Sequence, residues 1–368
     1  MKIKRAIKWS LFVIAVVLSI WLFIAYWTST NDCQRNAATP TNPMKAILSC
    51  EYGVENLKLQ EIEKPTPADN EVLVRVRAAS INPADGHLIR DSWLARLFSG
   101  LRKPKNTRFG TDFAGVVEAV GKNVTDFKPG DEVLGAKNGA VAQYICVKVD
   151  RAIVMKPSNI TFEQAGSVGI AGVTALQGLR DKGHIQAGQK VLINGASGGV
   201  GTFAVQIAKA FGAEVTAVCS TRNADLVKSI GADHVVDYTK EDFAKTDQRY
   251  DMIYDLVGNH GFSERRYILK PNGICVLAGI GGAGAHPETM GRIVGNFWNA
   301  FRSNFSKEKF VFYIAKLTKG DFGLLRDLMQ SGKVSPVIDR TYKLEQTADA
   351  VRYLEEGHAR GKVVVVID

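Results

Sequence analysis

The sequence contains few of the residues that hold metal ions. Its five cysteines include no Cys-X-X-Cys pair, and its six histidines are scattered along 368 residues. Because tetrahedral zinc needs several thiolate or imidazole donors close together, we predict no metal site. The odd number of cysteines argues against a disulfide framework and favours a reducing compartment. Four cysteines lie in apolar, strand-like runs, where cysteine usually serves as a small buried hydrophobe: Cys50, Cys146, Cys219 and Cys275.

The sequence also lacks the bias in composition and charge that is typical of disordered, fibrous or nucleic-acid-binding chains. Hydrophobic residues make up 46% and charged residues 23% of the chain, which are ordinary globular values. The length is sufficient for two domains. The net charge of +10 is moderate, and no nucleic-acid-binding motif accompanies it. Such a charge suits an anionic partner such as a phosphate-bearing cofactor or a lipid surface.

Charge is absent from one long stretch near the N-terminus. Residues 9–27 read WSLFVIAVVLSIWLFIAYW, nineteen uncharged residues that can cross most of a bilayer core. Aromatic side chains near its ends suit the membrane interface. A cleaved signal peptide and a buried core helix are the alternatives, but the following TSTNDCQRN offers no convincing cleavage site. We expect residues 1–30 to form an uncleaved transmembrane anchor and residues 31–43 a linker.

A glycine-rich turn between a strand and a helix marks the middle of the chain. Val191–Asn194 has a buried-strand pattern, the turn GASGGVG occupies 195–201, and apolar residues follow at helical spacing to residue 211. A second β run, Val215–Cys219, completes the first half of a doubly wound sheet. Glycine lets the backbone approach a pyrophosphate closely, and the helix N-terminus directs N–H groups at it. The unit therefore predicts a dinucleotide cofactor.

The end of the second β run indicates which dinucleotide is bound. NAD sites usually place an acidic residue there to bind the ribose 2′-hydroxyl. This chain has Ser220 and Arg222 instead, a hydroxyl and a guanidinium that suit a 2′-phosphate, and Asp225 lies further on. We therefore predict NADPH rather than NADH, with an ordinary surface arginine as the alternative for Arg222.

Strand-like runs before and after this unit define two parts. Val235–Asp237, Met252–Val257 and Gly273–Ile280 are predicted as further strands of the same sheet. Residues 44–160 differ, because short strand-like runs separated by turns dominate there. The chain ends in KVVVVID, another strand that can return to this β-rich part. The sequence thus predicts an α/β protein with a β-rich domain and a doubly wound domain.

Six motifs occur together between about Met44 and Asp368: ASINPAD (79–85), GTDFAGVVEAVGKNVTDFKPGDEV (110–133), AGVTAL (171–176), GASGGVG (195–201), GADHVVDY (231–238) and ARGKVVVVID (359–368). In this combination the chain resembles the medium-chain dehydrogenase/reductase superfamily, specifically its zinc-free, quinone-oxidoreductase-like branch. The resemblance implies a GroES-like catalytic domain at 44–165 and 308–368, and a Rossmann NADPH-binding domain at 166–307. It also implies a homodimer formed through the Rossmann domain.

Comparison with that superfamily also shows which ligands are missing. Zinc-dependent members place their ligands where this chain has Asn82, Pro83, Thr111 and Asp112. Without thiolate or imidazole donors there, no Lewis acid is held to polarise an alcohol or ketone, so acceptors that take hydride readily are favoured. The resemblance implies the same class: quinones and α,β-unsaturated carbonyls, reduced by NADPH.

Candidate site residues follow from the family positions. Asn82 lies where resembling enzymes line the nicotinamide cleft, and its amide can donate to an enolate oxygen; a turn-stabilising Asn before proline is the alternative. Several relatives carry Tyr or Lys where this chain has His87, which could supply a proton near neutral pH; a solvated His87, with solvent as the proton source, is the alternative. The implied cofactor-binding residues are Thr174, Gly195, Ser197, Gly198, Gly199, Val200, Gly201, Ser220, Arg222, Tyr238, Val257, Gly258, Ala278 and Gly279.

Two segments mix large apolar side chains with basic ones. We expect residues 89–105 and 292–313 to rim the substrate cleft and to face anionic lipid, with an apolar lid or ordinary packed helices as alternatives. The side of the membrane is contested. Basic residues precede the apolar run, so the positive-inside rule exports the folded part, whereas NADPH is a cytosolic cofactor. We favour the cytosol for the catalytic domain.

Two other functions fit the same sequence. One is an alcohol or aldehyde oxidoreductase on the same fold, which a panel of acceptors separates from a quinone or enone reductase. The other is a membrane-associated protein that binds NADPH without catalysis, suggested by the uncertain proton donor and the anchor. Our prediction is a zinc-independent, NADPH-dependent oxidoreductase that transfers hydride to a quinone or an α,β-unsaturated carbonyl.

Overall fold

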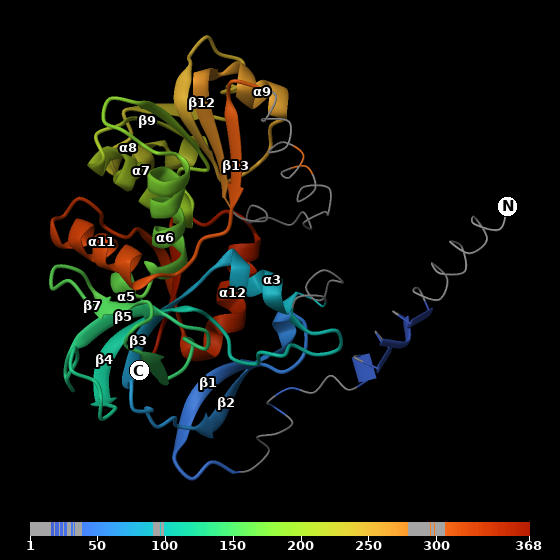
Figure 1. Cartoon of the computed structure of the whole chain (residues 1–368), viewed down its shortest axis with the longest axis vertical. Coiled ribbons are helices and arrows are strands. Elements are labelled where there is room, and N and C mark those ends of the chain that lie inside the picture. Colours follow the sequence, from blue (N-terminus) through green and yellow to red (C-terminus); the bar gives the residue numbers. More distant parts are fainter. Residues whose placement is uncertain are drawn as a thin grey trace.

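Two β-sheets, one above the other in Figure 1, form the framework of the molecule. The computed structural model describes residues 16, 17, 19–21, 23, 24, 26, 27, 31, 33, 39–90, 96, 99–278, 295, 298 and 306–368. The lower sheet belongs to the β-rich part, which is built from both ends of the folded chain. The upper sheet belongs to the nucleotide-binding part between them. This arrangement confirms the predicted α/β architecture.

The β-rich part contains a hairpin and a seven-stranded sheet. The hairpin joins β1 (Pro43–Ser49) to β2 (Leu57–Glu63). The sheet has the order β14-β15-β3-β4-β5-β7, with β6 also paired to β3. The closing valine run pairs antiparallel with β3 and is buried, as β-branched residues of a central strand should be. The strands are β3 (Glu71–Ile81), β4 (Asp112–Val120), β5 (Glu132–Ala136), β6 (Tyr144–Lys148), β7 (Ile153–Met155), β14 (Ile338–Lys343) and β15 (Lys362–Val366).

Six parallel strands form the upper sheet in the order β10-β9-β8-β11-β12-β13. This is the order of a doubly wound dinucleotide-binding sheet, whose switch point lies between β8 and β11. We expected this part to end at residue 307, but β13 pairs with β12. That boundary is wrong because Phe310 and Tyr313 bury their rings in the cores of this sheet. The strands are β8 (Lys190–Asn194), β9 (Glu214–Cys219), β10 (His234–Asp237), β11 (Tyr250–Asp255), β12 (Leu269–Ala278) and β13 (Lys309–Tyr313).

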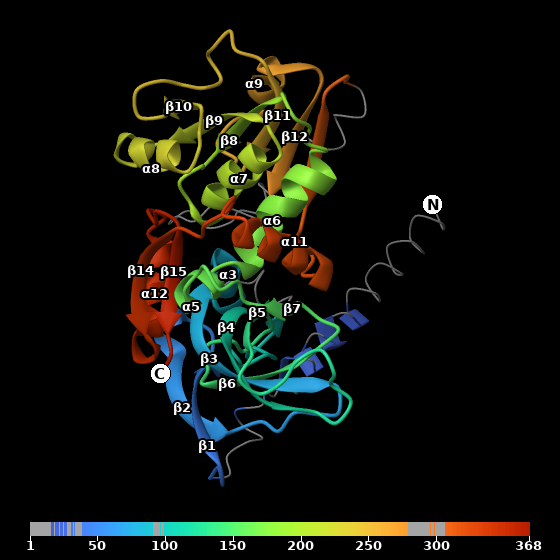
Figure 2. The same cartoon turned by 90° about the vertical axis from the view of Figure 1, so that its left-hand side faces the viewer.

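Helices cover the sheets and connect the two parts. α6 lies between the two sheets in both views (Figures 1 and 2). One apolar core contains Leu134 of the lower sheet, Leu176 of α6 and Ile193 of the upper sheet, so the two parts share a continuous core. The helices are α3 (Pro83–Ile89), α5 (Phe162–Ala165), α6 (Gly169–Gln177), the π-helix η2 (Gly178–Lys182), α7 (Gly199–Ala210), α8 (Ala224–Ser229), α9 (Phe262–Tyr267), α11 (Lys319–Gln330), α12 (Thr347–Glu355) and the 3₁₀ helices η1 (Val54–Asn56), η3 (Thr221–Asn223) and η4 (Leu344–Gln346).

A disulfide ties the expected linker to the β-rich part. Cys33 and Cys50 are bonded, with their Cα atoms 5.9 Å apart, and Asn31 Nδ2 donates to the Cys50 carbonyl oxygen at 2.7 Å. The interpretation of Cys50 as a small buried hydrophobe is therefore wrong, and the argument against a disulfide framework missed this single bond. An odd total does not exclude one bond, and Cys50 lies just after β1, where it can reach the linker. The other three cysteines, Cys146, Cys219 and Cys275, are buried free thiols, as predicted.

The expected anchor, residues 1–30, lies largely outside the described residues. Those described between 16 and 27 are helical, and Trp21 and Trp27 are 64% and 59% exposed. The guanidinium of Arg102 lies over the rings of Tyr26 and Trp27. Within the part of the chain that the structure describes, no helix combines the length and apolarity that a membrane span needs.

Candidate active site

A buried cluster of charged and polar side chains lies where the two parts meet. Asn82 follows β3, Asp112 begins β4 and Lys362 begins β15, so three adjacent strands deliver them. Lys362 Nζ lies 2.5 Å from Asn82 Oδ1 and 3.7 Å from Asp112 Oδ2. Asn82 Nδ2 donates to Asp112 Oδ2 at 2.9 Å. All three residues are at most 3% exposed, so the ammonium and the carboxylate compensate each other away from water.

Asp112 fixes the cluster relative to α6. Its Oδ1 accepts from Ile170 N at 2.8 Å, at the start of that helix, where a carboxylate is favoured by the free N–H groups. A Cβ on Gly169 would lie 2.0 Å from Asp112 Oδ1, so only glycine lets the helix end approach the carboxylate. Thr174, a predicted cofactor residue, lies about one turn further along α6. The cluster therefore lies about one helical turn from a predicted cofactor contact.

A second carboxyl group, Asp85 of α3, lies beside the first. Asp85 Oδ2 accepts from Asn82 N at 2.8 Å and its Oδ1 from Thr111 Oγ1 at 3.1 Å. Burial, together with the negative charge of Asp112, raises the pKa of Asp85 to about 6. Burial also lowers the pKa of Lys362, against the attraction of the two carboxylates. A carboxyl group that titrates close to neutral pH is a candidate for acid–base chemistry.

The amide of Asn82 is directed into the cluster. Its Nδ2 donates to Asp112 and, at 3.4 Å, to Asp85 Oδ2, and its Oδ1 accepts from Lys362. The predicted donation to a substrate oxygen conflicts with this geometry, because both acceptors of the amide nitrogen are carboxylates of the cluster. His87 lies half-buried on α3, and its role as a proton donor stays a prediction.

The glycine turn has the geometry of a pyrophosphate cradle. Gly195 adopts φ +88°, a conformation that favours glycine. A Cβ on Gly201 would lie 2.1 Å from the Gly195 carbonyl oxygen, so α7 and the turn pack closer than any other residue allows. The N–H groups of Gly199, Val200 and Gly201, in the first turn of α7, have no acceptor within the helix. They are available to an anion placed above the turn, beside Gly198.

Asn223 links the glycine turn to the end of β9. Its Nδ2 donates to Ser197 Oγ at 2.9 Å and to Ser220 Oγ at 3.3 Å, so two predicted cofactor residues lie side by side. Its Oδ1 is buried and has no hydrogen-bond partner in the described part of the chain. An unpaired buried acceptor costs free energy, and a cofactor hydroxyl would supply the missing donor. Asn223 was not predicted from the sequence, although it follows Ser220 and Arg222 closely.

Two arginines lie beside the end of β9. Arg222 Nη2 donates to the His358 carbonyl oxygen at 2.6 Å, and Arg360 Nη2 donates to the Arg222 carbonyl oxygen at 3.4 Å. Arg360 belongs to the loop between α12 and β15, so the β-rich part reaches across to β9. Paired guanidinium groups suit a 2′-phosphate. Arg360 was not predicted, because no residue near it in the sequence indicates that it lies beside residue 222.

Asp255 shapes the loop that follows β11. Its Oδ1 accepts from Val257 N at 3.1 Å and from Gly258 N at 2.8 Å, and its Oδ2 pairs with Arg265 Nε at 2.7 Å. A Cβ on Gly195 would lie 2.9 Å from Val257 Cγ2, so this loop contacts the glycine turn. The structure thus brings three predicted cofactor residues, Gly195, Val257 and Gly258, to one place.

The remaining predicted residues lie at the edges of this region. Ala278 ends β12, and Gly279 lies outside the described residues. Tyr238 follows β10; its backbone N–H donates to Cys219 O at 3.0 Å and its side chain is exposed. Large parts of the two basic, apolar segments, 89–105 and 292–313, also lie outside the described residues.

Lys362 joins the glycine turn to the buried cluster. A Cβ on Gly199 would lie 3.1 Å from Lys362 Cδ, so the lysine methylenes pass beside the start of α7. The ammonium at the other end reaches Asn82 and Asp112. The cradle and the cluster are therefore separated by the length of one side chain. In the sequence, Lys362 is marked only by its position directly before four valines. That pattern predicts a strand and not a site.

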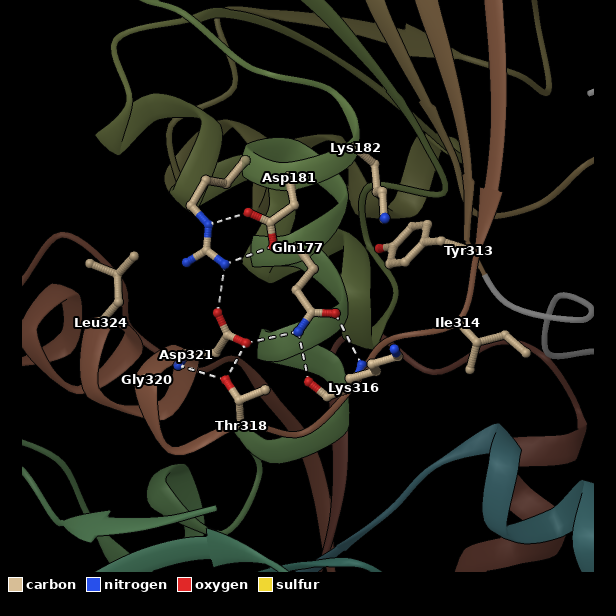
Figure 3. A pocket seen from close by; sticks show the side chains of 11 residues that line it. Gln177, Asp181, Lys182, Tyr313, Ile314, Lys316, Thr318, Gly320, Asp321 and Leu324 are labelled. Atoms are coloured by element: carbon tan, nitrogen blue, oxygen red, sulfur yellow. Dashed lines mark hydrogen bonds and ion pairs between the residues drawn. The ribbon is translucent and has the colours of Figure 1, made fainter. Parts of the chain in front are cut away.

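A separate pocket of about 700 Å³ lies beside α11 (Figure 3). Arg180 donates to Asp181 and to Asp321, each at 2.7 Å, and Gln177 Nε2 donates to Asp321 at 2.8 Å. These bonds fasten the end of α6 to α11. None of the predicted catalytic or cofactor residues lines this pocket, so the candidate active site is the cluster and the cradle described above.

Comparison with known proteins identifies the superfamily. Residues 68–158 match the family Alcohol dehydrogenase GroES-like domain, and residues 230–365 match the family Zinc-binding dehydrogenase. The chain is also 33% identical over 340 residues to the 2-methylene-furan-3-one reductase of Solanum lycopersicum, which covers 88% of this chain and 79% of that protein. The chain belongs to the medium-chain dehydrogenase/reductase superfamily. The predicted resemblance is thereby confirmed.

Two further members of this medium-chain superfamily are similar to the chain. The chloroplastic NADPH-dependent alkenal/one oxidoreductase of Arabidopsis thaliana is 34% identical over 339 residues, covering 88% of this chain and 79% of that protein. The solved structure of the quinone oxidoreductase from Coxiella burnetii is 29% identical, with a TM-score of 0.76, and covers 89% of this chain and all of that one. The chain is therefore an oxidoreductase. Among its described residues, no group of three or more His, Cys, Asp or Glu side chains could hold a metal ion.

Proposed function

We propose that this protein reduces α,β-unsaturated carbonyl compounds or quinones with NADPH. The observation that carries the proposal is the path of Lys362, which runs from the glycine turn to the buried carboxylates. This path supports a dinucleotide site that lies directly beside polar groups able to respond to a developing negative charge. The names of similar proteins support the acceptor class, since they include a 2-methylene-furan-3-one reductase, an alkenal/one oxidoreductase and a quinone oxidoreductase.

The residues present fit NADPH. Two features support the proposal: Asn223 Oδ1 has no hydrogen-bond partner among the described residues, and two arginines lie beside the end of β9, where a 2′-phosphate would be bound. When bound, NADPH supplies a hydride from its nicotinamide ring. From the adenosine end to the nicotinamide end, the proposed contacts are Arg360, Arg222, Ser220, Asn223, Ser197, the N–H groups of residues 199–201, Val257, Gly258, Ala278 and Thr174.

We propose that Lys362, although it is paired with Asp112, is the group of the cluster that stabilises a negative charge on the substrate. An acceptor that takes a hydride at carbon becomes an enolate or a phenolate, and fixed positive charge near it lowers the barrier. Lys362 is the cluster's cation, held by Asn82 and Asp112. Asn82 is therefore a positioning residue that orients this ammonium.

The proposal is tested with the full chain in detergent. NADPH oxidation is followed with a quinone, an enone and a simple aldehyde as acceptors, and NADH is assayed in parallel. Turnover of the quinone or the enone with a preference for NADPH is expected. Turnover of the aldehyde alone would instead assign an alcohol or aldehyde oxidoreductase, and tight NADPH binding without any turnover would assign a non-catalytic protein.

We also propose that the N-terminal apolar run anchors the protein in a membrane. The nineteen uncharged residues support this, as do the exposed tryptophans at 21 and 27. Arg102 beside the rings of Tyr26 and Trp27 gives the run a cation at its end, as suits the interface. Full-length protein should sediment with membranes after a high-salt or carbonate wash, and removal into the soluble fraction would contradict the anchor.

The disulfide reverses our preference for the cytosol. Disulfides persist in oxidising compartments, and Cys33–Cys50 follows the apolar run directly. Four basic residues precede the run, which keeps the N-terminus in the cytoplasm. We propose that the folded part lies on the opposite side, where NADPH must then be supplied. A membrane-impermeant protease added to intact cells or vesicles of known orientation distinguishes the two sides.

A further inference from the structure

Thr111 is the most exposed polar member of the buried cluster. It precedes β4 directly and is half-buried, whereas Asn82, Asp85, Asp112 and Lys362 are at most 5% exposed. Thr111 Oγ1 donates to Asp85 Oδ1 at 3.1 Å. One hydroxyl therefore connects a buried carboxyl group with the accessible side of the cluster.

Asp85 is surrounded by charges of both signs. Asp112 from β4 and Lys362 from β15 face it, and these two charges act on its protonation in opposite directions. The other titratable residue of α3 is His87. α12 packs on α3 and presents Glu355, but that carboxylate pairs with Arg90 at 3.2 Å. The protonation of Asp85 is therefore governed by two charges of the cluster, and the nearby surface ion pair does not include it.

We propose that Asp85 and Thr111 form a proton relay, in which Thr111 is the catalytic residue that protonates the reduced substrate. The proposal rests on the proposed function, because a relay is needed only if the acceptor leaves the hydride step as an anion. Among the described residues that bond to the cluster carboxylates through a hydroxyl, Thr111 is only partly buried, whereas Ser80 is fully buried on Asp112.

The relay conserves atoms and charge. After a hydride has been added to the β carbon of an enone, the electron pair of the double bond resides on the enolate. When Asp85 is protonated, its Oδ1–H donates to Thr111 Oγ1 across the same 3.1 Å contact, and the Thr111 hydroxyl hydrogen turns to the substrate. The Thr111 O–H bond breaks as a new O–H or C–H bond forms on the substrate, and Thr111 oxygen takes the proton of the Asp85 carboxyl group. The Asp85 carboxylate regains a proton from solvent before the next turnover.

The electrostatics suit a proton donor. Burial and Asp112 raise the pKa of Asp85 from its ordinary value of 3.8 to about 6, so the carboxyl group keeps its proton to a higher pH than an exposed one. A general acid is most effective when its pKa lies near the working pH. The hydrogen bond from Thr111 favours the carboxylate and therefore lowers the pKa of Asp85.

The first experiment compares two substitutions at one position. Thr111→Val removes the hydroxyl with little change in shape, and Thr111→Ser keeps it. With an enone and saturating NADPH, we expect kcat to fall about 100-fold in the valine variant, the lower end of the usual loss for a general acid. The serine variant should stay within about threefold of the native protein. The dissociation constant of NADPH should be unchanged in both.

The pH profile separates a relay from a packing role. Native kcat/KM should decline by about tenfold per pH unit above the pKa of Asp85, because the protonated carboxyl group is then lost. The Thr111→Val profile should be flat over the same range. A profile that keeps its shape in Thr111→Val would overturn the proposal.

A measurement on the protein without cofactor tests Asp85 independently. The free energy of unfolding is measured against pH for the native protein, Asp85→Asn and Thr111→Val. Because the folded-state pKa of Asp85 is raised, the native protein should lose stability relative to Asp85→Asn as pH rises from about 4 to about 6, and the difference should then level off. In Thr111→Val the pH range over which stability is lost should extend to higher pH, because the hydrogen bond that lowers the pKa of Asp85 is gone. No pH dependence of the difference would contradict the raised pKa and the relay.

Failure of the relay and failure of the proposed function give different results. If the native protein turns over no enone or quinone, the proposed function is wrong. If it does, and Thr111→Val matches it in kcat and pH profile, the relay alone is wrong. Loss of the pH dependence in His87→Asn but not in Thr111→Val would assign the proton to His87 and also overturn the relay.

Discussion

Ionised side chains that water does not reach occur on both sides of the cofactor site. Lys362 lies between the glycine turn and the carboxylates, and Arg265 lies under the loop after β11. Each is matched by a buried aspartate, Asp112 or Asp255. Removing one partner of such a pair leaves an uncompensated charge, which costs far more than an exposed ion pair contributes. These residues therefore hold the geometry of the site.

Arg265 offers a direct comparison with its neighbour. Arg265→Met should lower the free energy of unfolding by about 3–5 kcal/mol, because Asp255 loses its buried partner. Arg266→Met removes a half-exposed pair with Glu308 and should cost less than about 1 kcal/mol. Urea unfolding of both variants measures the difference. Equal costs would show that Asp255 does not depend on Arg265.

Two arginines are expected to select the cofactor. Arg222→Ala and Arg360→Ala should each raise KM for NADPH about tenfold or more, since a hydrogen bond to a charged group contributes about 1.5–3 kcal/mol and about 1.4 kcal/mol corresponds to tenfold. KM for NADH should change little. Arg326→Ala, a surface arginine of α11 paired with Asp327, is the control. A parallel rise for both cofactors would argue against a 2′-phosphate contact.

The strand, glycine turn and helix formed by β8, residues 195–198 and α7 make the element that binds the pyrophosphate in our proposal. Its geometry depends on glycine at two places for different reasons. Gly195 needs a left-handed backbone, and Gly201 needs the absence of a Cβ. Gly198 has neither need, because its φ is −80° and a Cβ there would meet nothing closer than 3.6 Å.

Alanine at Gly201 and at Gly198 should distinguish a glycine that must lack a Cβ from one that need not. Gly201→Ala brings a Cβ to 2.1 Å from a backbone oxygen, so α7 must shift; we expect a loss of about 1–3 kcal/mol of stability and of NADPH binding. Gly198→Ala should keep the native stability. Thermal unfolding and NADPH fluorescence titration report the two effects. A Gly201→Ala protein as stable as Gly198→Ala would show that the turn is not packed as described.

Elements that are determined by neighbouring residues in the sequence could be predicted, and features that depend on distant residues could not. The glycine turn and the valine strand were predicted because their signals lie within a few residues. The pairing of β13 with β12, the reach of Arg360 to Arg222 and the inward direction of the Asn82 amide were not, because each depends on residues far away in the chain. The sequence predicted that Asn82, Pro83, Thr111 and Asp112 replace the zinc ligands of related enzymes. It did not predict the ion pair of Lys362 and Asp112, which depends on how three strands are arranged in space.

The whole molecule is tied at both ends to the β-rich part. The C-terminal strand β15 completes the lower sheet and delivers Lys362, and the disulfide fastens Cys33 at the N-terminal side. The candidate active site therefore depends on a strand at the C-terminal end of the chain, after all six strands of the upper sheet. Deleting the last strand would remove the cation of the cluster together with the partner of β3.

Thiol counting tests the disulfide on the whole chain. In denaturant without a reductant, a maleimide reagent should modify three cysteines, and after reduction it should modify all five. Cys33→Ser should give four reactive thiols under both conditions, because Cys50 is then released. Five reactive thiols in protein kept from reductants during purification would show that the bond does not form in the cell.

In the membrane-anchored arrangement that we propose, the bond also sets how far the folded part can move from the bilayer. From Trp27 to the start of β1 at Pro43 the chain can extend by roughly 55 Å at about 3.3–3.6 Å per residue. With Cys33 bonded to Cys50, only the stretch from Trp27 to Cys33 remains as a leash, roughly 20 Å by the same rule. In that arrangement, so short a tether keeps the folded part close to the bilayer. Reduction of the bond would lengthen the tether to the whole stretch from Trp27 to Pro43 and let the folded part reach acceptors further from the membrane.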